Sequence, residues 1–320
     1  MNTEKILQSV LKGKTLSKDE AVALLQIQDG SLQFYNLLFI ANQLTRSEYN
    51  NKGYIFAQIG LNAEPCSKDC KFCSMGKSHY SMDSKWQKDI STIVSEVKSL
   101  VQQDISDLFL MTTADYPIER FLKVVKEIKK IIPEHIKLVA NIGDFNYEIA
   151  CKLKENGVTG VYHIHRLREG VDTGIVPQDR IKTLDSIRKA DLDLYYCVEP
   201  IGPEHTYEEL ADEMIRAREY KAGVMAVMRR IPVKGTPLYE KGQISAMELT
   251  KIAAVTRIVS QPKRAMNAHE VTPMTLLAGV NQLYAEYGAN PRDTESNTEK
   301  GRGYSVFDVK QLLVDAEYEL

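Results

Sequence analysis

Short apolar runs rich in β-forming residues alternate with amphipathic helical stretches over most of this 320-residue chain. Such alternation indicates parallel βαβ units joined by right-handed crossovers. Eight strands spread over this length predict an α/β protein, a (β/α)8 TIM-type barrel, with an open doubly wound sheet as the alternative. The expected strands are residues 54–61, 108–112, 137–141, 160–164, 194–198, 224–229, 264–267 and 282–286.

The first 50 residues predict an N-terminal helical extension rather than part of the barrel. Ser17 and Glu20 have the spacing of a capping box, and residues 32–45 carry apolar side chains at helical intervals. We therefore expect two parts, a helical extension at 1–50 and the barrel at 51–320. The polar stretch 290–304 predicts a surface loop before a last helix at 306–318.

Composition narrows the possible partners. The 41 basic and 43 acidic residues nearly cancel, which argues against a nucleic-acid-binding surface. No run approaches the roughly 18 apolar residues that span a membrane. The charged N-terminus lacks the apolar segment of a secretory signal, so we expect a cytoplasmic protein with no nucleic-acid and no membrane partner.

Three of the five cysteines, Cys66, Cys70 and Cys73, fall within eight residues, directly after the first expected strand. A barrel enzyme places its active site on such a βα loop. Three thiolates can bind three irons of an iron–sulfur cube and leave the fourth iron open, whereas a fourth cysteine closes the coordination in electron carriers. The alternatives are a structural zinc site with His79 as the fourth ligand, or unrelated thiols. Cys151, in a helical stretch, is interpreted as structural.

The spacing Cys-x3-Cys-x-aromatic-Cys, with Phe72 as the aromatic residue, resembles the hallmark of the radical S-adenosylmethionine (SAM) superfamily. This resemblance implies a 4Fe–4S cluster on the three cysteines, with SAM chelated at the open iron next to Phe72. It further implies reductive cleavage of SAM to a 5′-deoxyadenosyl radical, which abstracts hydrogen from a substrate.

The resemblance extends from about residue 54 to 292 and is closest to the branch of biotin synthase, the hydrogenase-cofactor maturase and methylornithine synthase. It implies that Arg180 contacts the SAM carboxylate and that Ile201 and Gly202 meet the adenine. Thr113 and Asp115 correspond to the region that holds the SAM amino group. Glu169 lies at the strand end that touches the ribose.

The chain also departs from biotin synthase. That enzyme holds an auxiliary, sulfur-donating cluster on three further cysteines and an arginine of the barrel strands, and here only Cys197 and Arg264 correspond. The other two expected positions fall near Leu110 or Met111 and near Ala140. Biotin synthesis itself is therefore not expected.

Polar residues at the ends of the expected strands point to the substrate. His163 and His165 would share one face of the fourth strand, which is followed by Arg166 and Arg168, and Arg229 closes the sixth. Because arginine forks bind carboxylates, His165 and these three arginines predict a catalytic site for a small anionic substrate, such as a carboxylate-bearing molecule. The alternative is that the arginines pair with Glu199, Glu204 or Glu270.

The leading hypothesis is a radical SAM enzyme that functionalises, rearranges or cleaves a small anionic molecule in an anaerobic setting, supplied with electrons by a flavodoxin- or ferredoxin-type donor. A second hypothesis is a lipoyl or metallocofactor assembly enzyme with a sulfur- or carrier-supplying partner. A third is a non-catalytic zinc or iron–sulfur protein.

Overall fold

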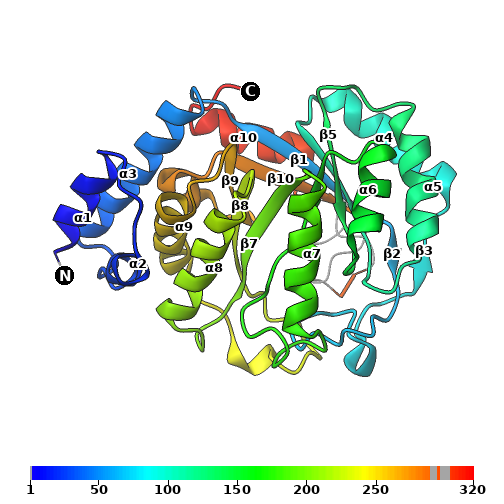
Figure 1. The fold of residues 1–320 in the computed structure, drawn as a ribbon, viewed down its shortest axis with the longest axis horizontal. Helices are drawn as coiled ribbons and strands as arrows, with labels where there is room; N and C mark the ends of the chain where they lie inside the picture. Colours follow the sequence, from blue (N-terminus) through cyan, green and yellow to red (C-terminus); the bar gives the residue numbers. More distant parts are fainter. Residues whose placement is uncertain (1, 289–293, 296–302) are drawn as a thin grey trace.

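Eight parallel strands close into a barrel in the computed structural model, which describes residues 2–288, 294–295 and 303–320 (Figure 1). The order around the barrel is β1-β10-β9-β8-β7-β6-β5-β4, so the chain visits neighbouring positions in turn and β10 closes onto β1. This confirms the (β/α)8 prediction. The strands are β1 Tyr54–Gly60, β4 Asp107–Met111, β5 Lys137–Asn141, β6 Gly160–Tyr162, β7 Asp193–Ile201, β8 Val224–Arg229, β9 Ala265–His269 and β10 Gln282–Tyr287.

Helices surround the barrel because each presents one apolar stripe to the strands. In α5, Phe121, Leu122, Val125 and Ile128 are buried at helical spacing while charged residues face outward. The last helix, α10, packs over the neighbouring strands β1 and β10. The helices are α4 Ile90–Leu100, α5 Ile118–Lys129, α6 Tyr147–Glu155, α7 Pro177–Lys189, α8 Tyr207–Glu219, α9 Ala246–Ser260 and α10 Val306–Asp315, with 3-10 turns η1 Lys77–His79, η2 Val101–Gln103, η3 Tyr239–Lys241 and η4 Pro273–Ala278.

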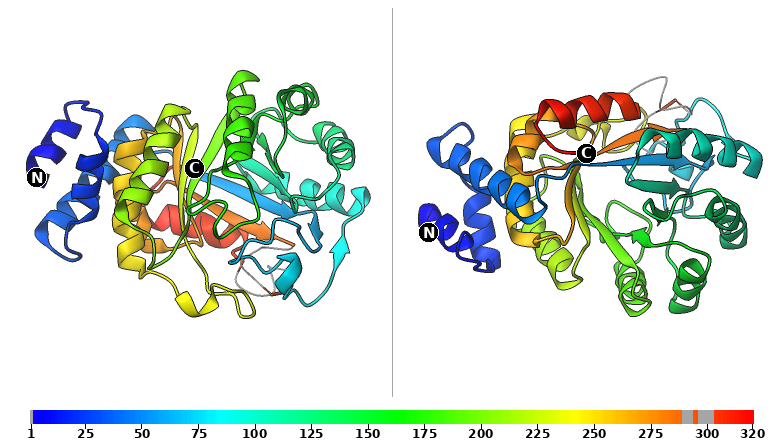
Figure 2. Two further views of the ribbon diagram at one scale, coloured as in Figure 1. Left: turned by 60° about the horizontal axis from the view of Figure 1, so that its bottom comes forward. Right: turned by 90° about the horizontal axis from the view of Figure 1, so that it is seen from above.

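The N-terminal helices α1 Thr3–Val10, α2 Lys18–Leu25 and α3 Leu32–Glu48 lie on one side of the barrel (Figures 1 and 2). Helices α2 and α3 pack against α8, α9 and η4, and α1 packs against α2 and α3. The predicted capping box at Ser17 and Glu20 is present. Leu24 and Phe34 belong to the same apolar core as the barrel strands, so the extension is packed onto the barrel. The domain boundary at residue 50 stays a prediction, and most of the loop expected at 290–304 lies outside the described residues.

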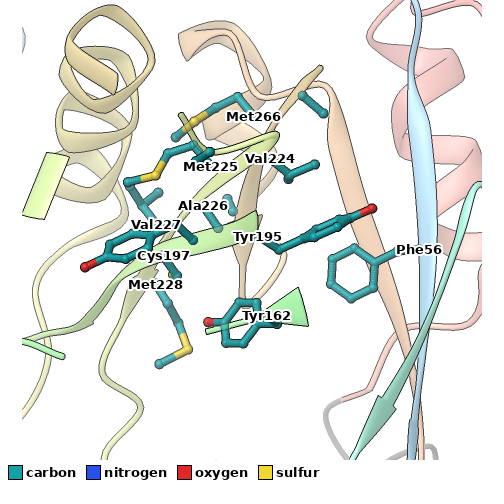
Figure 3. Close-up of a cluster of buried hydrophobic side chains, with 14 of the residues drawn as sticks. Phe56, Tyr162, Tyr195, Cys197, Val224, Met225, Ala226, Val227, Met228 and Met266 are labelled. Carbon is teal, nitrogen blue, oxygen red and sulfur yellow. The ribbon is translucent and has the colours of Figure 1, made fainter. Parts of the chain in front are cut away.

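Strand alternation decides which side chains fill the barrel. Along β7, alternation places Tyr195, Cys197 and Glu199 on the inward face and Tyr196 on the outward face, where its hydroxyl donates to Glu213 of α8. Figure 3 shows the Tyr195 ring beside Phe56 in the barrel interior. The register with β8 shifts between Val198 and Ile201, where β7 carries Glu199 to the carboxyl end of the barrel. This end holds the βα loops, and with them the site described below.

The amino end of the barrel is closed by a buried ion pair. Asp107 at the start of β4 is fully buried and accepts hydrogen bonds from Arg264 at 2.6 and 3.2 Å, from Tyr195 at 2.5 Å and from Gln282 at 2.8 Å. Arg264 therefore belongs to the floor of the barrel, held by a carboxylate. This corrects its assignment as a counterpart of a cluster-binding arginine.

Among the described residues, no helix is both long enough and apolar enough to cross a membrane.

Candidate active site

The three cysteines lie on a compact loop that follows β1 and the short strand β2 Asn62–Ala63, which pairs with β3 Trp86–Gln87. Backbone hydrogen bonds fold the loop back on itself, because Cys66 donates to Met75 at 2.7 Å and Cys73 donates to Cys70 at 2.9 Å. The Met75 N–H also points at the sulfur of Cys73, 3.4 Å away. The loop thus presents its sulfurs from a fixed backbone.

His79 braces this loop. Its Nε2 lies 3.1 Å from the carbonyl oxygens of both Cys70 and Cys73, and its Nδ1 lies 3.1 Å from the Ser78 hydroxyl. A Cβ added at Gly76 would lie 2.3 Å from that Nε2, so glycine is needed for the close approach. Since both ring nitrogens already have partners, His79 does not fit as a zinc ligand.

The spacing of the three thiols also disfavours a single metal ion. Sulfurs bound tetrahedrally to zinc at about 2.3 Å lie about 3.8 Å apart. Within the described part of the chain, the three loop cysteines do not form a set of ligand atoms gathered within 4.8 Å of one another. Burial raises the pKa of Cys70 to about 11 and raises that of Cys73 further, and the neighbouring thiols add to both shifts. The loop therefore favours a larger cationic group that bridges separated thiolates.

All three cysteines open into one large cavity at the carboxyl end of the barrel. It contains about 1180 Å³ of space, including solvent at its mouth. Its inner wall is aromatic, with Phe56 of β1 stacked between Phe109 and Tyr284 at centroid distances of 4.2 and 5.0 Å. Polar side chains gather on its remaining wall: Asn62, Thr113, Asn141, His163, Arg166, Arg180, Glu199 and His269.

Arg180 is fixed on the cavity wall by two carboxylates. Its Nε lies 3.3 Å from Glu169, and its Nη1 lies 3.2 Å from Asp144. His163 Nε2 also lies 3.2 Å from the same Asp144 oxygen. Burial lowers the pKa of His163 to about 4, so the imidazole is neutral at pH 7. Burial alone would raise the pKa of Asp144, but His163 and Arg180 hold it well below its usual range, and the carboxylate stays ionised.

Arg166 is a partly buried cation, with a side chain 20% exposed, whose buried Nε and Nη1 donors are unused. Its Nε lies 3.5 Å from Glu199, yet neither Nε nor Nη1 has a hydrogen-bond partner among the described residues. Burial would lower the pKa of Arg166, but the charges of Glu199, Glu169 and Cys70 raise it, so the guanidinium stays charged. A buried charged donor without a partner is costly. Arg166 is therefore suited to receive an acceptor from a bound molecule.

The structure places four of the predicted site residues in this cavity with the cysteines: Phe72, Thr113, Arg166 and Arg180. Thr113 is held by Asn62, whose amide donates to its hydroxyl at 2.9 Å. Two more predicted residues, Asp115 and Glu169, lie outside the cavity wall and support parts of it. Asp115 accepts from the backbone and hydroxyl of Ser67 at 2.6 Å and so anchors the cysteine loop. Glu169 orients Arg180.

The remaining predicted residues do not line the cavity. His165 turns toward the helix layer, where its Nδ1 lies 2.9 Å from Glu213, because β6 already ends at Tyr162 and its alternation does not continue to residue 165. The expectation that His163 and His165 share a face is corrected accordingly. Arg168 pairs with Asp172 at 3.2 Å. Arg229 points away from the inward-facing Met228 and donates to the Ile244 carbonyl at 3.3 Å.

Ile201 and Gly202, expected to meet an adenine, also lie outside the cavity wall. The guanidinium of Arg230 packs against Gly202, where an added Cβ would lie 2.5 Å from its nitrogens. Arg230 in turn forms a two-point ion pair with Glu204. Arg230, the residue that follows Arg229, is therefore paired with a carboxylate.

Two residues of the cavity wall, Glu199 and His269, and one residue beside it, Asp144, were not among the predicted catalytic or cofactor-binding residues. Asp144 follows β5 at the carboxyl end, which is a signal that strand position alone could have given. Glu199 and His269 meet across the barrel from β7 and β9, with the Tyr162 hydroxyl 2.8 Å from one and 3.5 Å from the other. Sequence separation hides such contacts until the barrel closes.

Biotin synthases resemble this chain along most of its length. The enzyme of Desulforudis audaxviator (strain MP104C) is 27% identical over 294 residues, covering 87% of this chain and 88% of that one. The enzyme of Clostridioides difficile (strain 630) is 26% identical over 269 residues, covering 80% and 81%. This likeness supports a radical SAM enzyme of the biotin synthase-like branch. No protein-family model matches the chain.

Two solved structures share the fold of this chain. Methylornithine synthase superposes with a TM-score of 0.81 at 16% identity, covering 97% of this chain and 95% of that one. The FeFe-hydrogenase maturase HydG of Carboxydothermus hydrogenoformans also gives 0.81, at 18% identity, covering 99% and 78%. The barrel and its N-terminal helices thus form a fold that these two structures share.

Proposed function

We propose that Cys66, Cys70 and Cys73 hold a 4Fe–4S cluster and that SAM binds beside it in the barrel cavity, with a small anionic substrate deeper inside. The proposal rests mainly on one observation: all three cysteines line the same cavity as Arg166 and Arg180. Thiols too widely spaced for one ion, on a loop with an N–H aimed at sulfur, suit a cluster.

The bound cluster and SAM would supply a one-electron reductive cleavage that yields a 5′-deoxyadenosyl radical. The residues of the chain itself would bind and orient SAM and the substrate. Arg180, fixed by Glu169 and Asp144, is the proposed partner of the SAM carboxylate, because an immobilised guanidinium binds carboxylates at low entropic cost. Thr113, positioned by Asn62, is the proposed partner of the SAM amino group.

Arg166 is the proposed anchor of the substrate. Its unused donors at Nε and Nη1 face a cavity whose inner wall is aromatic, which suits an anionic head on a largely apolar body. The same wall excludes water from the reacting carbon. Holding one C–H bond close to the reactive carbon is how such a site selects a single position.

The first experiment is 5′-deoxyadenosine formation by the anaerobically reconstituted enzyme with SAM and dithionite. Wild type should form product and bind iron and sulfide, whereas Cys73→Ala should form none at unchanged thermal stability. Cys151→Ala is the matched control and should behave like wild type, because Cys151 lies on α6 outside the cavity. Uptake of zinc in place of iron by the wild type would contradict the proposal.

A second experiment tests the substrate class. A panel of small carboxylates is screened for stimulation of 5′-deoxyadenosine formation, and any active compound is titrated against Arg166→Gln. Loss of a charge-assisted hydrogen bond of roughly 1.5–3 kcal/mol should raise the half-maximal concentration about 10- to 100-fold. An unchanged concentration dependence would remove Arg166 from the proposal, and stimulation by a carrier protein alone would favour the assembly-enzyme hypothesis.

A further inference from the structure

A second group of ligand-type side chains lies inside the barrel, apart from the cysteine loop. The sulfur of Cys197, a carboxylate oxygen of Glu199 and a ring nitrogen of His269 all lie within 4.8 Å of one another. None of the three residues is more than 7% exposed. Cys197 and Glu199 share the inward face of β7 (Figure 3 shows Cys197 there), and His269 ends β9, two strands away.

The donor set has the chemistry of a transition-metal site. One sulfur, one imidazole nitrogen and one carboxylate oxygen are the ligand types that zinc accepts, and three protein ligands with an open position are typical of its reactive sites. Glu199 and His269 line the large cavity, so an ion between them would be reached from it. The open position would face the space assigned to the substrate.

The surroundings hold these side chains in place. The His269 ring is enclosed by Phe56, Tyr162 and Tyr284, with centroid distances of 5.8, 5.4 and 5.1 Å. The Tyr162 hydroxyl donates to Oε2 of Glu199 at 2.8 Å, and Arg166 lies 3.5 Å from Oε1. A carboxylate offers about four lone-pair sites, so each oxygen keeps one for a metal. Hydrogen bonds to a ligating carboxylate are the usual outer support of a metal site.

The other comparable set in the described residues, Asp172, Glu204 and His205, differs in its partners. Arg230 takes both oxygens of Glu204, while Lys71 and Arg168 pair with Asp172 at 3.4 and 3.2 Å. Three cations already neutralise two carboxylates there. At the barrel set, Arg166 lies 3.5 Å from Glu199, and the charges of Glu169 and of Cys70 in the cysteine loop also act on this arginine.

We propose that Cys197, Glu199 and His269 bind one divalent transition-metal ion of the zinc class, whose open coordination position faces the cavity and takes a donor atom of the substrate. Ion binding itself is independent of the proposed radical chemistry. Only the role of the open position rests on that function.

The test uses the full-length triple variant C66A/C70A/C73A, which removes the thiols of the cysteine loop. After metal removal, this protein is titrated anaerobically with Co2+ and then with competing Zn2+. A single bound Co2+ per chain with a thiolate-to-cobalt charge-transfer band is expected. Adding Cys197→Ala should abolish the band, whereas Glu199→Gln or His269→Gln should keep the band and weaken binding at least ~10-fold.

His205→Gln in the same background is the matched control and should leave the titration unchanged. Failure to bind Co2+ in a variant that keeps wild-type circular dichroism would overturn the proposal, as would a band that survives Cys197→Ala. Iron content and 5′-deoxyadenosine formation, measured in the protein with its loop cysteines intact, report separately on the proposed function. The two proposals can therefore fail independently.

Discussion

The two ends of the barrel each bury an arginine beside a carboxylate, but the two pairs are completed differently. At the floor, both oxygens of Asp107 are taken by Arg264, and Tyr195 and Gln282 add two more donors. At the mouth, Arg166 reaches Glu199 only at 3.5 Å and leaves donors unused. The floor is a satisfied network that stabilises the fold, whereas the mouth keeps capacity for a bound molecule.

The largest expected effect lies at the floor. Asp107→Ala leaves the Arg264 guanidinium, whose side chain is 24% exposed, without its buried carboxylate, which should lower the free energy of unfolding by up to roughly 3–5 kcal/mol. The measurement is urea unfolding followed by circular dichroism. The protein that remains folded should keep the SAM affinity of the wild type, because Asp107 does not contact the cavity. A loss below about 1 kcal/mol would mean that the floor pair is not structural.

The next prediction concerns the mouth of the barrel, where His163 should make the free energy of unfolding depend on pH. Burial lowers the pKa of His163 from 6.5 to about 4, so the neutral imidazole contributes stability that is present above pH 6.5 and is lost as the pH falls toward 4. The difference of about 2.5 pH units corresponds to about 3 kcal/mol. His163→Gln should flatten the urea stability profile by that amount between pH 7 and 4.

The comparison of variant with wild type cancels any acid sensitivity of a bound cluster that the two share. His135→Gln, a change at an exposed histidine, is the matched control and should leave the profile unchanged. Parallel profiles for wild type and His163→Gln would show that His163 titrates normally and that the mouth is better hydrated than its burial indicates.

Much of the fold and part of the candidate site could be predicted from the sequence. The strands follow the apolar pattern closely, and β5 and β8 begin and end at the predicted residues, because parallel barrel strands are buried on both faces and stay apolar throughout. The cysteine loop was found because three ligands within eight residues need no tertiary information. Local sequence patterns were therefore sufficient to predict the fold and one wall of the site.

The rest depended on closure of the barrel. Whether Arg264 belongs to the floor or to a ligand site is decided by Asp107, 157 residues away in sequence. Cys197 and His269 likewise meet only when β7 and β9 take their places around β8. At the fourth strand, alternation was extended to His165, but β6 is only three residues long. A periodic pattern cannot locate the point at which a strand ends.

A smaller effect distinguishes two arginines that the sequence analysis places at the site, Arg180 beside SAM and Arg168 beside the substrate. Arg180→Gln should weaken SAM binding about 10- to 100-fold, because Arg180 is the fixed cation of the cavity wall. Arg168→Gln should leave SAM binding unchanged, since Arg168 pairs with Asp172 outside the cavity. Calorimetric titration of SAM into the reconstituted protein measures both. Equal losses in the two variants would point to a general electrostatic effect instead of a contact.

The smallest effect is expected at His165. Its Nδ1 lies 2.9 Å from Glu213, which also accepts from the Tyr196 hydroxyl and from Arg216, so the carboxylate keeps two partners when the imidazole is removed. His165→Gln, whose amide can still donate to Glu213, should therefore change the free energy of unfolding by less than about 1 kcal/mol. It should also leave 5′-deoxyadenosine formation at the wild-type rate. A large loss of activity at unchanged stability would mean that the loop after β6 swings His165 into the cavity during turnover, and the mouth would then hold one more functional residue than the structure assigns to it.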